Sequence, residues 1–330
     1  MSAMKKRIEW LALLRGLNIL LVVMFHVQLI DMTTGENHLF CSLVCQPFNS
    51  IRMPLFIFCS GGLLYLSRIK KGCSIKDLYI DKFIRICCPF IFFVTFFYFL
   101  KLALNPFVKT QVTFSIGNFL ESFYIYPDHP SAHLWFLSVL FWFMLLYPLF
   151  RWLCKNRIWM NLFLLFTIVF YFVDIKVDKN YFYMFSLNEY LVYFFFGIFF
   201  FYYRLYRYFN SKTSLLSVII LFILCLTADI PLLKSIAGIL VMIAVSQQLV
   251  QIYPTLFISF REYIYQIFLM SFIFQPFVEL ILWKKLFYNE QLFLVFYILN
   301  ILAGIYMPVL ISKLVEYSNI KGLKICLGLK

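Results

Sequence analysis

Residues 14–26 read LRGLNILLVVMFH and lie inside an apolar run that extends from about residue 10 to residue 30. A run of about 20 mostly apolar residues is long enough to cross the hydrocarbon core of a bilayer as one α-helix. The run contains Arg15 toward one end and His26 toward the other, although ionisable groups are costly inside a membrane and usually serve a function there. The stretch therefore predicts a transmembrane helix that carries functional side chains.

The composition extends this prediction to the whole chain. Of the 330 residues, 63% are hydrophobic, 43 are Phe and only 13% are charged. A soluble domain cannot bury that much apolar surface, so a soluble enzyme, a disordered chain and a secreted disulfide scaffold are excluded. Long continuous apolar runs, rather than short alternating ones, also exclude a β-barrel. The expected fold class is all-α, a polytopic helical bundle in a membrane.

Ten apolar segments are candidate membrane spans, and together they form one domain over residues 1–330 with no soluble domain. The long loops 31–47 and 105–131 are expected outside, and the basic loop 68–85 is expected inside with a short amphipathic helix. The ten segments are 10–30, 48–67, 86–104, 132–150, 158–173, 188–203, 214–230, 232–251, 258–282 and 291–312.

The basic residues predict the orientation. With the N-terminus inside, 20 Lys and Arg residues fall in inner segments and six in outer ones, which is the bias of a multi-pass protein with both termini in the cytoplasm. The same clustering between apolar runs argues against nucleic-acid binding as the reason for the net charge of +14. The first run is too long for a signal-peptide core and has no small-residue cleavage site. The expected location is the cytoplasmic (inner) membrane.

Cysteine and histidine spacing does not predict a metal site. The nine cysteines form no CxxC pair. Cys41 and Cys45 share one predicted outer loop. A disulfide between them and two unpaired thiols remain alternatives. His129 and His133 are four residues apart, but Pro130 lies between them and no third ligand cluster is present.

The spacing of Arg15 and His26 places them on one face of the first helix. Eleven residues at 100° each give three turns plus 20°, and the two side chains are separated by about 16 Å along the axis. A cation fixed at the inner level and a titratable imidazole near the outer end suit binding and proton transfer. The alternative is two separate structural roles, with Arg15 extending to the headgroups and His26 in an interhelical hydrogen bond.

The same stretch resembles the opening of the acyltransferase-3 family of integral membrane acyltransferases. The similarity includes RIEW at 7–10, LRG at 14–16 and VVMFH at 22–26. The family has an Arg or Lys, then ten residues, then a His in its first span, and Arg15 and His26 match that spacing.

Four further stretches are similar to family motifs and occur in the family's order. Residues 52–61, RMPLFIFCSG, resemble H-M-P-L-F-F-F-x-S-G, and residues 82–89, KFIRICCP, resemble its basic R-x-x-R loop before a proline. Residues 133–137, HLWFL, match its H-L-W-F-L, and residues 265–271, YQIFLMS, resemble Y-x-I-Y-L-x-H.

The chain also departs from the family pattern at three positions. Ala12 stands where the family usually has an Asp, Arg52 stands at the His of H-M-P, and Ser271 stands at the His of the ninth-span motif. These departures leave the handling of protons open, while the Arg15–His26 pair is retained.

The resemblance implies transfer of an acyl group, most often acetyl, from cytoplasmic acyl-coenzyme A to a hydroxyl of a cell-surface polysaccharide or lipid-linked glycan. It implies His26 as the catalytic residue, as a general base or through an acyl-imidazole. The expected coenzyme A phosphate ligands are Arg15, Arg68, Lys82 and Arg85.

The expected acceptor-binding residues are Arg52, His133 and Trp135. Arg52 has an alternative role as counter-ion of Glu279 or Asp31, and Trp135 as an interface anchor. Acyl-coenzyme A is a substrate rather than a resident cofactor, and other expected partners are membrane lipid and polysaccharide-assembly proteins.

Two other functions remain open. The first is a transporter or flippase of a lipid-linked sugar, with Arg15 and Arg52 on its pyrophosphate, although no internal repeat is visible. The second is a non-catalytic scaffold, in which the Arg15–His26 pair has no purpose.

Overall fold

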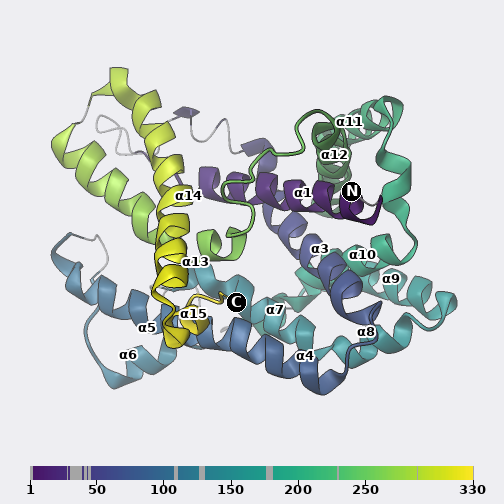
Figure 1. The fold of residues 1–330 in the computed structure, drawn as a ribbon, viewed down its shortest axis with the longest axis horizontal. Helices are drawn as coiled ribbons and strands as arrows, with labels where there is room; N and C mark the ends of the chain where they lie inside the picture. Colours follow the sequence, from purple (N-terminus) through teal and green to yellow (C-terminus); the bar gives the residue numbers. More distant parts are fainter. Residues whose placement is uncertain are drawn as a thin grey trace. The chain divides into compact units, whose positions relative to one another are not determined.

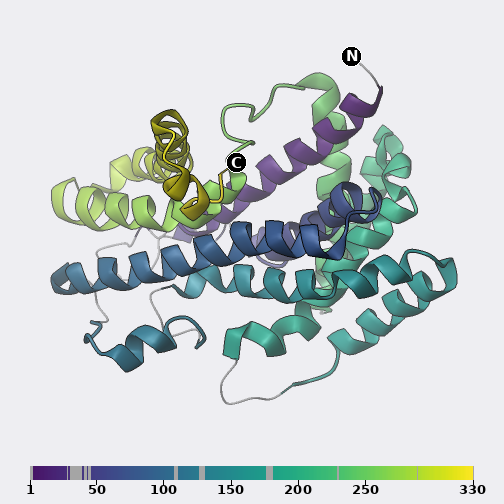
Figure 2. The same ribbon diagram turned by 60° about the horizontal axis from the view of Figure 1, so that its bottom comes forward.

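The structure is a computed structural model in which every described regular element is a helix (Figures 1 and 2). It describes residues 3–27, 29, 39–40, 43, 46–107, 111–125, 131–175, 181–228, 230–287 and 289–329. Asp31, His129, Pro130 and the Cys41–Cys45 question lie outside these ranges. His38 and Lys109, which are used in predictions below, lie outside them as well. The described chain groups into two compact units, of which the first is Met1–Cys59 with Tyr203–Ser318 and the second is Ser60–Tyr202 with Asn319–Lys330.

The first unit is built around helix α1 (Ala3–Phe25), which packs against α12, α13 and α14 (Figure 1). α11 and α12 form a tightly packed pair, as do α13 and α14. Its other elements are η1 (Gln46–Phe48), the start of α3 (Arg52–Leu64), η7 (Leu205–Phe209), α11 (Lys212–Thr227), α12 (Pro231–Ile252), α13 (Ile264–Phe277), η8 (Val278–Leu286), η9 (Glu290–Leu292) and α14 (Phe293–Ser318).

The second unit contains one long helix, which runs through α4 (Ile75–Lys82), η3 (Phe83–Cys87) and α5 (Cys88–Ala103) and lies beside α7 (Figure 2). Ser74 caps its start by accepting a hydrogen bond from the Asp77 N–H at 3.1 Å. The other elements are η2 (Tyr65–Ile69), η4 (Asn105–Phe107), α6 (Ile116–Glu121), η5 (Ala132–Leu134), α7 (Trp135–Leu145), α8 (Tyr147–Leu153), α9 (Arg157–Tyr171), η6 (Tyr181–Ser186), α10 (Leu187–Tyr202) and α15 (Lys321–Cys326).

Glycine allows a close helix approach inside the second unit. A Cβ added at Gly61, at the end of α3, would overlap the carbonyl oxygen of Phe194 in α10, and one at Gly62 would overlap the ring of Phe201. The two helices can approach this closely because only a residue without a side chain fits at Gly61 and Gly62.

A proline bends the fourth predicted span. α7 and α8 meet at 53° across Leu146. Pro148 has no N–H for the carbonyl of Met144, and its ring clashes with the preceding turn, so the helix breaks at this point.

Each of the ten predicted segments overlaps a described helix, and the all-helical fold class is confirmed for the described residues. Four described helices are long and apolar enough to cross a membrane, at Ile75–Ala103, Pro231–Ile252, Ile264–Leu286 and Glu290–Ser318. The bent pair α7–α8 makes a fifth if it counts as one span. The count of ten spans, the orientation of the termini and the single domain stay predictions.

Cysteine labelling tests the predicted topology. On a background without the nine native cysteines, a new cysteine at Lys71 or Lys321 should be protected from an impermeant reagent in intact cells. A new cysteine at Lys109 should be labelled, because that loop is predicted outside by the charge bias. Labelling of the Lys321 position from outside would contradict the ten-span topology.

Candidate active site

The C-terminal end of α1 positions His26. The helix ends at Phe25, and the backbone N–H of His26 donates to the Val23 carbonyl at 3.1 Å, which is the tighter i→i−3 bond common at helix ends. Helical geometry up to Phe25 keeps the predicted alignment of His26 with Arg15 on one face, about 16 Å apart along the axis. The histidine is half-buried and lies at the end of the helix rather than within it.

The hydrogen bond of the imidazole fixes which ring nitrogen holds the proton. Nδ1 of His26 lies 2.7 Å from the carbonyl oxygen of Val22. A carbonyl oxygen only accepts hydrogen bonds, so Nδ1 must donate and carry a hydrogen. In the neutral ring, Nε2 is then the nitrogen with a free lone pair, which is the form a general base needs.

Aromatic rings and one arginine surround the imidazole. The ring of Phe272 in α13 meets it edge-on at 4.3 Å between centroids, and the ring of Phe25 lies at 5.5 Å. The guanidinium carbon of Arg52 lies 3.1 Å from the centroid of the Phe25 ring, a cation–π contact, and Arg52 interacts electrostatically with His26. The structure thus brings together His26 and Arg52, two of the predicted site residues.

A buried pair of amides, not anticipated from the sequence, holds the last turn of α1. Nε2 of Gln275 in α13 donates to the Val23 carbonyl at 2.9 Å and to Oδ1 of Asn300 at 3.0 Å. Nδ2 of Asn300 in α14 donates to the Gln275 carbonyl at 3.2 Å. A Cβ added at Gly304 would lie 2.9 Å from Val23 and 3.0 Å from Gln275, so the helices touch closely here. The sequence indicated this amide pair only by placing one amide side chain inside each of two apolar runs.

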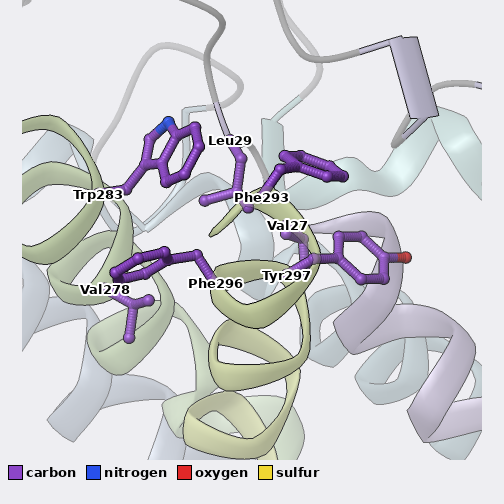
Figure 3. Close-up of a cluster of buried hydrophobic side chains, with 7 residues drawn as sticks. All are labelled: Val27, Leu29, Val278, Trp283, Phe293, Phe296 and Tyr297. Carbon is purple, nitrogen blue, oxygen red and sulfur yellow. The ribbon is translucent and has the colours of Figure 1, made fainter. Parts of the chain in front are cut away.

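A cluster of apolar side chains fixes the chain that follows His26 (Figure 3). Val27 and Leu29 are buried against Trp283 of η8 and Phe296 of α14. With the Val23 contacts on one side and this cluster on the other, the position of His26 is fixed from both directions along the chain.

Arg15 is a half-buried cation without a carboxylate partner. Among the described residues it makes no ion pair, and its electrostatic neighbour is the buried thiol of Cys59 in α3. A thiol is mostly neutral near pH 7 and does not balance the charge. A buried charge is costly unless it is paired, so the site is suited to an anionic ligand.

A strained loop crosses α1 beside Arg15. The segment between α12 and α13 passes over α1 in Figure 1, and Phe257 in it has a φ of 63°, which is uncommon for a residue with a side chain. An added Cβ at Gly16 would lie 3.2 Å from Phe257, so glycine next to Arg15 allows this loop to approach.

The second unit brings together the three other predicted phosphate ligands. Arg68 pairs with Asp81 at 2.7 Å and Arg85 pairs with the other oxygen of Asp81 at 3.0 Å. Lys82 interacts electrostatically with all three. Arg68 and Arg85 each lie in a π-helical turn, η2 and η3, an irregularity frequent at functional sites. One carboxylate offsets part of the charge of three cations, and the group remains net positive.

In the second unit, His133 lies in η5 and Trp135 is the first residue of α7. The His133 ring meets the Phe97 ring edge-on at 4.5 Å, and the Trp135 ring lies 4.9 Å from that of Tyr190. Trp135 is half-buried among aromatic rings, an arrangement that suits both an anchor and a sugar-stacking surface. Of the predicted residues, Arg15, His26 and Arg52 belong to the first unit, and Arg68, Lys82, Arg85, His133 and Trp135 belong to the second.

Searches among curated proteins and among solved structures gave no match. The sequence model of the acyltransferase-3 family, described as an acyltransferase domain, matches residues 8–313, which is nearly the whole chain. The match includes both the Arg15–His26 helix and the basic group at Arg68 and Arg85. The chain is thus a membrane protein and an acyltransferase, and it belongs to the acyltransferase-3 family.

Proposed function

We propose that this protein is a membrane O-acyltransferase, and specifically an O-acetyltransferase. In this proposal it moves the acyl group from cytoplasmic acyl-coenzyme A to a hydroxyl of a cell-surface polysaccharide or lipid-linked glycan. The observation that carries the proposal is the arrangement on α1. An imidazole with Nε2 free to accept a proton directly follows the last residue of α1, and Arg15, which makes no ion pair among the described residues, lies eleven residues earlier, about 16 Å along the axis of an ideal helix and on the same face. A transferase with a long, terminally anionic donor needs both groups at such a separation.

The donor is held by its phosphates. Coenzyme A carries its phosphates at one end and the reactive thioester at the other. Arg15 binds phosphate oxygens through charge-assisted hydrogen bonds, and Arg68, Lys82 and Arg85 add the positive potential of the second unit. The arm then extends along α1, so that the thioester reaches the level of His26.

His26 supplies the proton transfer. Nε2 takes the proton from the acceptor hydroxyl as its oxygen attacks the thioester carbonyl carbon, because a sugar hydroxyl is too weak an acid to be ionised near neutral pH. Collapse of the tetrahedral intermediate breaks the carbon–sulfur bond. The imidazolium returns its proton to the departing coenzyme A sulfur, so the ester and the free thiol are formed and His26 is restored.

Arg52 lies on the acceptor side in this proposal. Its guanidinium, held over Phe25, is near enough to His26 to interact with it electrostatically, and it stabilises the oxyanion or an anionic sugar. His133 and Trp135 contribute to acceptor binding from η5 and the start of α7. The proposed location is the cytoplasmic membrane, with the basic loops inside.

Mass spectrometry of envelope glycans tests the function. Glycans from cells that make the protein should carry an additional acyl mass that is missing from cells without it. The acyl group should also transfer from labelled acyl-coenzyme A to glycan in membranes. If glycans from cells with and without the protein have the same masses, and cells without it accumulate a lipid-linked sugar in the inner leaflet, the protein is a flippase and the proposal is wrong.

A further inference from the structure

Asn18 is a buried amide of α1 that has no hydrogen-bond partner in the described part of the chain. Its side chain is 1% exposed, and its Oδ1 atom is buried without a donor. Other buried amides of the same unit make at least one hydrogen bond each, although Oε1 of Gln275 also lacks a donor. Gln247 donates to the Tyr206 carbonyl at 2.9 Å, and Gln275 and Asn300 bond each other. A buried amide left without a partner is destabilising, so its presence calls for a ligand.

The position of Asn18 on the helix indicates which ligand. It lies three residues after Arg15 and eight before His26, which puts it within about 60° of the first and about 80° of the second around the axis. Along the axis it is about 4.5 Å from Arg15 and about 12 Å from His26. Asn18 therefore lies between the proposed phosphate site and the proposed reaction centre, on the same side of α1.

We propose that Asn18 binds the pantetheine arm of acyl-coenzyme A, with its Oδ1 accepting a hydrogen bond from an amide N–H of that arm. The arm carries two secondary amides between the diphosphate and the thioester, and each needs a partner once it leaves water. A carboxamide meets that need without adding charge, and lipid chains cannot donate such a bond. The inference rests on the proposed function, because it assumes that acyl-coenzyme A lies along α1.

The test compares the whole donor with its nucleotide part. Equilibrium binding of acetyl-coenzyme A and of adenosine 3′,5′-bisphosphate, which lacks the arm, is measured on the full-length protein in detergent micelles. Asn18→Leu should raise the Kd for acetyl-coenzyme A about tenfold to a hundredfold, the effect of losing a buried hydrogen bond. It should leave the Kd for the nucleotide unchanged, because the nucleotide never reaches Asn18.

The unfolding temperature provides a second readout, in which Asn18→Leu is expected to improve the protein although it weakens donor binding. Asn18→Leu removes an amide without a partner, so the donor-free protein should unfold at a higher temperature than the wild type. The matched control is Asn188→Leu in α10, since Asn188 is equally a buried amide but donates to the Val173 carbonyl at 2.8 Å. That control should unfold at a lower temperature and bind both ligands as the wild type does. Asn18→Ala, which adds no bulk, should reproduce the affinity pattern of Asn18→Leu.

The outcomes separate the two proposals. Equal affinity of the wild type and both Asn18 variants for acetyl-coenzyme A overturns the role of Asn18 and leaves the acyltransferase function standing. A similar loss for acetyl-coenzyme A and for the nucleotide also overturns it, since the effect is then not on the arm. If the wild type binds neither ligand, the proposed donor itself is wrong.

Discussion

Replacing His26 by Gln is expected to abolish detectable glycan acylation while the protein remains folded in the membrane. A correctly placed base contributes on the order of 10²–10⁴-fold to the rate, and Gln has no lone pair that takes up a proton at neutral pH. The hydrogen bond to the Val22 carbonyl at 2.7 Å can be retained by the amide of Gln. The loss is therefore expected in the rate of transfer and not in membrane abundance or in acyl-coenzyme A affinity.

Two other histidines serve as controls for this result. His133→Ala should have an intermediate effect, because His133 is proposed to bind the acceptor. His38→Ala, in the loop predicted to lie outside, should be nearly silent. Transfer is followed with labelled acyl-coenzyme A in membranes that contain equal amounts of each variant. A His26→Gln protein that acylates glycan at nearly the wild-type rate would make His26 a structural residue and would favour the flippase interpretation.

The positions of the helices were predictable because each is specified by a local apolar run. The join between α4 and α5 was not predicted, since the inner loop 68–85 and the span 86–104 were treated as separate. Pro89 has no N–H to offer the Arg85 carbonyl, and the helix absorbs this through the π-turn η3, in which the Cys88 N–H reaches back to the Phe83 carbonyl. One helix of 29 residues results, Ile75–Ala103.

The candidate site was predictable only as far as it lies along one helix. The phase of Arg15 and His26 follows from helical geometry. The ring that meets His26 comes from Phe272, and the amides that hold the last turn of α1 come from Gln275 and Asn300. All three lie more than 240 residues further along the chain, and no local pattern relates them to α1. The pair of Asp81 with Arg85 has the local i,i+4 spacing of a helix, whereas the pair of Asp81 with Arg68, 13 residues away, could not be predicted from the charge of this loop.

Replacing Arg15 by Met is expected to weaken acyl-coenzyme A binding about tenfold to a few hundredfold. The expected loss is that of hydrogen bonds between a cation and phosphate oxygens. Met retains an unbranched stem of similar length, so packing beside Gly16 and Cys59 is disturbed little. Adenosine 3′,5′-bisphosphate should lose affinity as well, in contrast to the Asn18 variants, because its phosphates are the groups that Arg15 is proposed to bind.

The same substitution separates a ligand site from a structural role for Arg15. If Arg15 stabilised the fold through a partner, its removal would lower the unfolding temperature. Arg15 has no ion pair among the described residues, so its removal should raise the unfolding temperature of the donor-free protein. Arg157→Ala, which removes an exposed charge at the start of α9, controls for the change in net charge and should alter neither quantity. Unchanged affinity together with a lower unfolding temperature for Arg15→Met would show that this cation serves the fold, and the donor phosphates would then have to bind elsewhere.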